Sequence, residues 1–225
     1  MGTSTRSVDM AVNGTSIVGD LTEPAHPIGV VLFAHGSGSS RNSPRNRYVA
    51  GVLQDGRLAT FLVDLLSEEE GIADQQGARN RFDVELLAGR LVKAMEFLRS
   101  DAALAELPVS LFGASTGAAA ALVAAARHPR WVSSIVSRGG RALLAGNALE
   151  QVRCPTLFIV GGADLATLEE NEGAMTQMRC ETTLVVIPAA GHLFAEPGAL
   201  EEVARVACDW FEKYAIQDEA SRAAD

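Results

Sequence analysis

The chain has 225 residues, and 48% of them are hydrophobic, which is enough to bury a sizeable core. Its formal net charge of −9 makes a polyanion such as DNA or RNA an unfavourable partner. No apolar segment has the length of a membrane span, and no apolar region of a secretory signal follows the polar start. Three cysteines without metal-ligand spacing are typical of a reducing compartment, so we expect a cytoplasmic protein.

No linker rich in proline or serine divides the chain, which predicts one domain over residues 1–215 and a frayed polar tail over 216–225. The first segment alternates apolar and polar residues, with Val8, Met10 and Val12 on one side of Asn13-Gly14. Both turn residues tolerate a positive φ, so this pattern predicts an N-terminal β-hairpin.

Apolar strands alternate with helical segments along the rest of the chain. Buried strands are predicted at 28–34, 58–65, 109–112, 131–136, 156–160 and 183–187. Helices are predicted from 43 towards 53 and at 82–98, 116–127, 167–178 and 197–214, with a glutamate-rich loop around 68–70. The alternation predicts an α/β fold: a mostly parallel central sheet with helices on both faces. In such sheets ligands bind beyond the carboxyl ends of the strands.

One of these strand ends carries Gly113-Ala114-Ser115-Thr116-Gly117, followed by an alanine-rich helix. A Gly-x-Ser-x-Gly segment between a strand and a helix is typical of a nucleophile elbow, a sharp turn that exposes the serine Oγ above the sheet. The simpler explanation is a strand-to-helix turn made of small residues. The position between strand and helix favours the catalytic interpretation.

Two later strand ends carry an acid and a base. Asp164 follows Gly162-Ala163 after one strand, and His192 follows Gly191 after the next. Asp164 could instead cap the helix that follows it, although one role does not exclude the other. His192 is the only histidine after Asp164. The order Ser, Asp, His is the chain order of the α/β-hydrolase triad, so we expect Ser115, Asp164 and His192 to be catalytic.

With these motifs and His35-Gly36-Ser37-Gly38, the chain resembles the α/β-hydrolases, and among them the compact dienelactone-hydrolase-like esterases, over nearly its whole length. Dienelactone hydrolases use a cysteine nucleophile, whereas the elbow here carries Ser115. The resemblance therefore implies a serine hydrolase that cleaves carboxylic esters of small soluble substrates, without a metal or an organic cofactor. The same triad would serve an acyltransferase, a perhydrolase, a thioesterase or an amidase, and a non-catalytic ligand-binding relative is a further alternative.

The resemblance also places an oxyanion hole. The backbone N–H of Thr116, next after the nucleophile, is one expected donor, and the loop after the first parallel strand supplies the second. We expect the N–H of Ser37 there, with Gly38 as the alternative. His35 precedes the serine, so it is expected to shape this loop and not to act as the base.

Arginines follow two predicted strand ends near the mouth of the site. The simpler explanation of Arg41, Arg138 and Arg141 is ion pairing with the acidic surface. Alternatively, Arg138 or Arg141 could bind a substrate carboxylate through two hydrogen bonds. Together with Gly36 and Gly38, these arginines are the substrate-binding candidates.

Two further expectations concern the surroundings of the site. Only a short segment at 142–152 could form a cap, so the cap is expected to be minimal or absent and the cleft open. Gly36-x-Gly38, with Asp64 ending the next strand, imitates a dinucleotide-binding fingerprint, but Arg41 occupies the third glycine position. The sequence predicts neither the natural substrate nor the oligomeric state.

Overall fold

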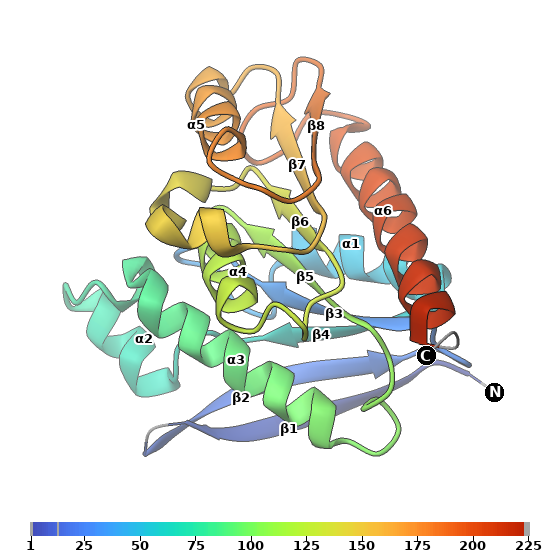
Figure 1. Cartoon of the computed structure of the whole chain (residues 1–225). Helices are drawn as coiled ribbons and strands as arrows, with labels where there is room; N and C mark the ends of the chain where they lie inside the picture. Colours follow the sequence, from blue (N-terminus) through green and yellow to red (C-terminus); the bar gives the residue numbers. More distant parts are fainter. Residues whose placement is uncertain (1, 13, 223–225) are drawn as a thin grey trace.

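Strands and helices alternate through most of the computed structural model, which describes residues 2–12 and 14–222 (Figure 1). Its strands form one sheet in the order β1-β2-β4-β3-β5-β6-β7-β8. They are β1 (Ser4–Val12), β2 (Thr15–Glu23), β3 (Gly29–Ala34), β4 (Leu58–Val63), β5 (Val109–Ala114), β6 (Ile135–Arg138), β7 (Thr156–Gly161) and β8 (Thr182–Ile187). From β4 to β8 all neighbours are parallel, which confirms the mostly parallel sheet.

Helices cover both faces of this sheet. They are α1 (Pro44–Asp55), α2 (Glu68–Gln75), α3 (Val84–Ser100), α4 (Thr116–Arg127), α5 (Leu165–Met175) and α6 (Ala199–Arg222), with shorter 3-10 segments η1 (Asn80–Phe82) and η2 (Ala142–Gln151). Residues of α3 and α4 share one apolar core, and residues of α1 and α6 share the core on the opposite face (Figure 1). β3 and β5 lie between these two cores, and every residue of both strands is buried.

The N-terminal hairpin is confirmed, because β1 and β2 pair antiparallel from Ser4↔Glu23 to Val12↔Thr15. Val8, Met10 and Val12 are buried on one face of β1 while most of their neighbours are exposed. Asn13 of the predicted turn lies outside the described residues, and Gly14 has a φ of 84°.

The glutamate-rich segment was wrongly predicted as a loop, since Glu68 begins helix α2. The Ser67 side chain accepts a hydrogen bond from the N–H of Glu70, and the Glu70 side chain accepts one from the N–H of Ser67. This reciprocal capping box satisfies two backbone donors that the first turn would leave free. Ser67-x-x-Glu70 was the sequence signal for the helix.

The end of the chain also differs from the prediction. Helix α6 continues to Arg222, so residues 216–222 of the expected frayed tail are helical. The segment after Tyr214 contains neither glycine nor proline, and its alanine, glutamine and glutamate residues favour a helix. Residues 223–225 lie outside the described range.

Strand β6 starts later than predicted, at Ile135, and ends at Arg138. Trp131, expected at its start, instead stacks on His128 with 4.0 Å between the ring centroids. The shift places Arg138 inside the sheet, opposite Ala114 of β5, and not in the loop beyond it.

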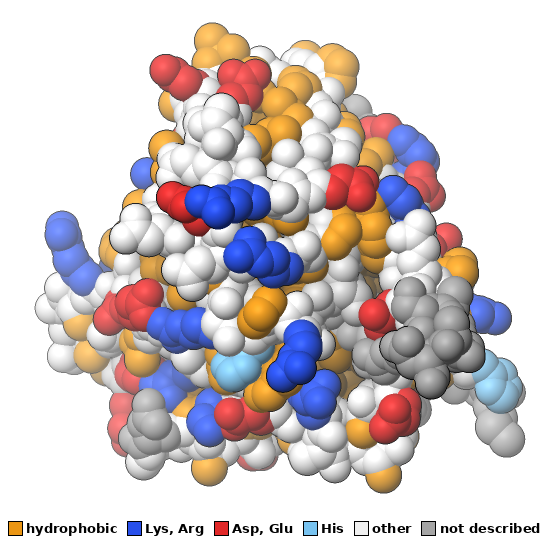
Figure 2. Space-filling view, viewed as in Figure 1, with side chains coloured by type: hydrophobic (Ala, Val, Ile, Leu, Met, Phe, Trp, Pro, Cys, Tyr) orange, Lys and Arg blue, Asp and Glu red, His pale blue; other side chains and the backbone are white. Residues whose placement is uncertain are grey.

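The surface carries both signs of charge. On the face shown in Figure 2, acidic and basic side chains are interspersed and not separated into large patches of one sign. No helix in the described part of the chain combines the length and the apolar character that crossing a membrane requires. The segment expected as a cap is η2, which packs against α4 and α5.

Candidate active site

The turn between β5 and α4 has the strained backbone of a nucleophile elbow. Ser115 has φ 51° and ψ −122°, a conformation that non-glycine residues rarely adopt. A Cβ on Gly113 would lie 2.4 Å from the Cα of Ala118, and one on Gly117 would lie 2.3 Å from the carbonyl oxygen of Ala34. Strand and helix therefore approach so closely that only glycine fits on either side of Ser115.

Two neighbouring loops, after β7 and β8, are joined by backbone hydrogen bonds. The N–H of Gly162 donates to Ile187 O at 2.8 Å, and the N–H of Ala163 donates to Ala190 O at 2.9 Å. A Cβ on Gly161 would lie 2.2 Å from the carbonyl oxygen of Ala190, so a larger residue there would push the loops apart. This contact fixes Asp164 relative to His192.

Asp164 uses its two carboxylate oxygens for different partners. Oδ2 accepts a hydrogen bond from His192 Nδ1 at 2.7 Å, while Oδ1 accepts the N–H of Thr167 at 3.4 Å and caps α5. Burial disfavours the charged carboxylate, but the hydrogen bonds from Thr167 and His192 outweigh it and lower the pKa of Asp164. The capping and histidine-binding roles weighed for this residue thus occur together.

Ser115 lies next to this pair without a bond to it. No hydrogen bond joins Ser115 Oγ to the His192 ring within residues 2–12 and 14–222. The N–H of Ser115 donates to the carbonyl of Arg138 at 3.2 Å. Gly139 follows Arg138 in the chain, and a Cβ on Gly139 would lie 3.6 Å from Cε1 of His192. Ser115 and the His192 ring thus flank the same end of β6. Catalytic hydrogen bonds are often long without substrate and shorten in the complex.

The loop after β3 rests directly on the elbow. A Cβ on Gly36 would lie 3.1 Å from the Cβ of Ser115. The N–H of Ser37, the expected oxyanion donor, donates to the Thr116 hydroxyl at 2.9 Å. The sequence assigned Thr116 a backbone role only, so this side-chain link was missed. Gly38, the alternative donor, has a φ of 72°.

The His35 side chain fixes the loop after β3 through hydrogen bonds at both ring nitrogens. Its Nε2 accepts the N–H of Leu65 at 3.0 Å, which leaves Nδ1 to donate to Gly36 O at 2.9 Å. Burial lowers the pKa of His35, so the ring stays neutral and keeps both bonds. These contacts support the expected role in shaping the loop and leave no ring nitrogen free to act as a base.

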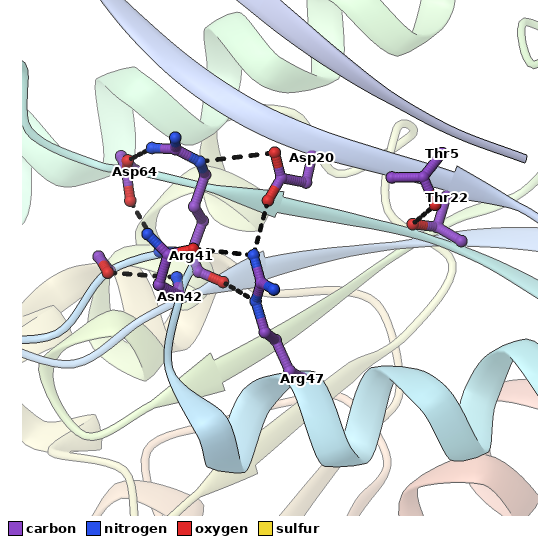
Figure 3. A network of polar contacts seen from close by, with 8 residues as sticks. Thr5, Asp20, Thr22, Arg41, Asn42, Arg47 and Asp64 are labelled. Atoms are coloured by element: carbon purple, nitrogen blue, oxygen red, sulfur yellow. Dashed lines mark hydrogen bonds and ion pairs between the residues drawn. The ribbon is translucent and has the colours of Figure 1, made fainter.

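Of the three candidate arginines, two form ion pairs. Arg41 lies between two carboxylates: it donates hydrogen bonds to Asp64 and forms an ion pair with Asp20 at 3.5 Å. Arg47 of α1 reaches the same Asp20 at 3.1 Å (Figure 3). Arg141 pairs with Glu170 at 2.8 Å. The simpler explanation therefore accounts for Arg41 and Arg141. Arg138 has no acidic partner among the described residues.

A cavity of about 520 Å³ lies beside the loop after β3. Neither Ser115 nor His192 lines it, but Gly36 and Ser37 do, so it adjoins the elbow. The carboxylate of Asp64, which a dinucleotide ribose would need, is bound to Arg41. Within the described part of the chain, no three His, Cys, Asp or Glu side chains gather as a metal site would require.

A serine on a strained turn after the central strand, with an aspartate and a histidine at later strand ends, is the arrangement of the α/β-hydrolases. Solved structures share this fold. A dienelactone hydrolase from Anabaena variabilis is 51% identical, with a TM-score of 0.93 over 95% of this chain and 99% of that one. Est1E from Butyrivibrio proteoclasticus, 14% identical over 94% of this chain and 99% of its own, has a TM-score of 0.78 and shares the fold. The chain belongs to the dienelactone-hydrolase-like family of α/β-hydrolases.

A curated relative has a different name. A protein of Mycobacterium tuberculosis called "Putative phosphoribosyl transferase" is 52% identical over 204 residues, which are 91% of this chain. The aligned region is 45% of that protein, so this chain spans less than half the length of its curated relative. No family model matches the chain.

Proposed function

We propose that this protein is a serine hydrolase that cleaves carboxylic esters of small soluble substrates through an acyl-enzyme on Ser115. The observation that carries the proposal is the 2.7 Å hydrogen bond between Asp164 and His192, beside a serine in a strained elbow. The likeness to a dienelactone hydrolase over nearly the whole chain supports the same class of reaction.

The hydrogen bond to Asp164 determines which nitrogen of His192 acts as the base. Because Nδ1–H donates to Asp164, the lone pair lies on Nε2, on the opposite side of the ring. Nε2 accepts the Ser115 proton while Oγ attacks the carbonyl carbon, and Asp164 stabilises the imidazolium that forms. The proton then passes to the leaving alcohol, and water releases the acyl group by the same steps.

The oxyanion of the tetrahedral intermediate requires donors next to Ser115 Oγ. The N–H of Thr116, at the start of α4, is the first, and the positive end of the helix dipole favours charge there. For the second we propose the N–H of Ser37, which exchanges the Thr116 hydroxyl for the substrate oxygen. Because Gly36 packs directly against the Cβ of Ser115, the N–H of Ser37 would need only a small movement to reach the substrate oxygen.

The proposed site contains no cysteine that could replace Ser115 as the nucleophile. Cys154, Cys180 and Cys208 all lie in other parts of the chain, and burial raises the pKa of Cys154 to about 12. A neutral buried thiol is a poor nucleophile. This favours ordinary ester chemistry on Ser115 over the cysteine chemistry of authentic dienelactone hydrolases.

The proposal is tested by replacing Ser115 with alanine and measuring hydrolysis of p-nitrophenyl butyrate together with labelling by a fluorophosphonate probe. We expect turnover to fall by about 10³-fold or more, since loss of a triad member removes most of the rate enhancement. Ser100→Ala, which removes an exposed hydroxyl at the end of α3, should keep both signals. Undiminished turnover or labelling in Ser115→Ala would disprove the proposal. A panel of thioesters, amides and alcohol acceptors would then separate ester hydrolysis from the related reactions of the same triad.

A further inference from the structure

The cavity of about 520 Å³ beside the loop after β3 has a size typical of small-molecule sites. Three segments that are distant in the sequence form its wall: the start of β2, the loop after β3 and helix α2. The cavity meets the elbow at the loop after β3. Gly36 and Ser37 line it, and a Cβ on Gly36 would lie 3.1 Å from the Cβ of Ser115. A molecule held in the cavity can therefore extend to Ser115.

Side chains with hydroxyl groups recur in the lining of this cavity. Five serines contribute to it: Ser16, Ser37, Ser39, Ser40 and Ser67. The hydroxyls of Ser16, Ser37 and Ser39 make no hydrogen bond within residues 2–12 and 14–222, and the same is true of the Gln75 amide. The lining also contains four apolar side chains: Ile17, Val18, Leu66 and Leu87. The wall thus offers unused hydrogen-bonding groups next to small apolar surfaces.

Both arginines of the lining are already paired with carboxylates. Arg41 donates hydrogen bonds to Asp64 (Figure 3), and Arg81 forms an ion pair with Asp74 at 3.1 Å. Glu68 also lines the cavity and makes no ion pair in the described part of the chain. An anionic group would therefore meet a free carboxylate and no unpaired cation. A long alkyl chain would remove the free hydroxyls from water without replacing their hydrogen bonds, which is costly. The lining favours a neutral polar group.

The order of the strands indicates which part of an ester enters the cavity. The loop after β3 lies on one side of β5, and β6, β7 and β8 lie on the other. His192 follows β8, so the cavity and the proposed base lie on opposite sides of Ser115. In the proposed mechanism His192 protonates the leaving alcohol, which must therefore lie on the side of His192. The acyl part is then directed towards the cavity.

We propose that this cavity is the acyl subsite and that it selects a neutral acyl group bearing several hydroxyls, such as a polyhydroxylated ring. The inference rests on the proposed hydrolase function and adds the substrate class: esters of polyhydroxy acids. Each hydroxyl of such a group both donates and accepts hydrogen bonds, as the free serine hydroxyls and the Gln75 amide do. The C–H faces of the ring match the four apolar side chains of the wall.

Methyl quinate and methyl cyclohexanecarboxylate test the subsite, since both carry a six-membered ring on the carbonyl and only the first bears hydroxyls. The quantity measured is the ratio of their kcat/KM values, followed by acid release. Gly71 of α2 lines the cavity, and a Cβ on it would meet nothing within 4 Å. We expect Gly71→Leu to fill the cavity and lower the ratio by about tenfold or more, because each lost hydrogen bond costs a factor of about two to ten.

Gly51→Leu is the matched control. Gly51 lies in α1, outside the cavity wall, and a Cβ on it would also meet nothing within 4 Å, so the ratio should stay unchanged. Ser39→Ala removes one free hydroxyl without adding volume and applies even if Gly71→Leu does not fold. It should lower the ratio by about two- to tenfold, whereas Ser100→Ala at the end of α3 should not.

The possible outcomes separate the subsite from the hydrolase proposal. An unchanged ratio in both Gly71→Leu and Ser39→Ala, or an equal loss on both esters, would overturn the subsite and leave the hydrolase proposal intact. Undiminished turnover of both esters by Ser115→Ala would refute the hydrolase proposal itself. A second pair, 6-O-butyrylglucose and cyclohexylmethyl butyrate, carries the hydroxyls on the alcohol. A fall confined to this pair would overturn the assignment to the acyl part.

A binding measurement without catalysis completes the test. In the Ser115→Ala protein, saturation-transfer difference NMR should show the ring protons of methyl quinate in contact with the protein. The signal should weaken strongly in Ser115→Ala/Gly71→Leu and persist in Ser115→Ala/Gly51→Leu, because only the first substitution fills the cavity. Signals of equal strength in the two double variants would contradict binding in this cavity.

Discussion

Replacing Asp164 by asparagine would separate the two hydrogen bonds that its carboxylate makes. The amide oxygen of asparagine can still accept the N–H of Thr167, and asparagine caps helices as well as aspartate does. The amide NH₂ facing His192 cannot accept Nδ1–H, so the ring would turn to the tautomer with its proton on Nε2. The base would then have no lone pair directed at Ser115.

The expected loss in kcat is about 10⁴-fold, the size of the effect that this exchange has in a serine protease with the same triad. That factor corresponds to about 5.4 kcal/mol of transition-state stabilisation. The free energy of unfolding should change by less than about 1 kcal/mol, because the cap of α5 is kept.

The assay is hydrolysis of p-nitrophenyl butyrate alongside thermal unfolding. Asp83 offers a matched control, since it caps α3 by accepting the N–H of Leu86 at 3.0 Å and lies outside the site. Asp83→Asn should keep both activity and stability. A loss in kcat below about tenfold for Asp164→Asn, in a folded protein, would refute the role assigned to the carboxylate.

Three other changes have definite expected outcomes. Gly117→Ala places a Cβ 2.3 Å from a backbone oxygen of β3 and should lower the melting temperature by about 5 °C or more, whereas Gly51→Ala, with nothing within 4 Å, should not lower it. Thr116→Val removes the hydroxyl that positions the Ser37 loop against the elbow and should reduce kcat by about tenfold, and Thr116→Ser should restore it; a wild-type kcat in Thr116→Val would contradict this positioning role. The folded-state pKa of Asp164 is lowered, so its stabilisation is complete above the ordinary value of 3.8 and is lost as pH falls through the lower folded value. The difference in melting temperature between wild type and Asp164→Asn should therefore shrink below about pH 4, and a difference constant with pH would argue against it.

The features that the sequence predicted are those with short-range signals. The elbow could be predicted because Gly113 and Gly117 are required by contacts within the same turn. The hairpin followed from the alternation around Gly14. Helix α2 was not predicted although its signal is equally local: three adjacent glutamates are also typical of a solvated loop, and only the capping pair Ser67 and Glu70 distinguishes the helix.

Other features depend on contacts between distant segments and leave no pattern in the sequence. The bond between Ser37 and Thr116 joins residues 79 positions apart. The isolation of Arg138 depends on where β6 begins, since its register decides which face the side chain enters. Arg41 and Arg138 look alike in the sequence, and only the three-dimensional arrangement shows that Arg41 has carboxylate partners while Arg138 has none within residues 2–12 and 14–222.

Backbone hydrogen bonds between the loops after β7 and β8 hold Asp164 and His192, the proposed acid and base, together, while Ser115 lies on a separate turn. Because Ser115 lies on its own turn, the residue at this position could be exchanged without disturbing the bond between Asp164 and His192. If Ser115 is the nucleophile, we expect a thiol introduced by Ser115→Cys to meet the same His192–Asp164 pair, so that one substitution would exchange oxygen for sulfur as the attacking atom.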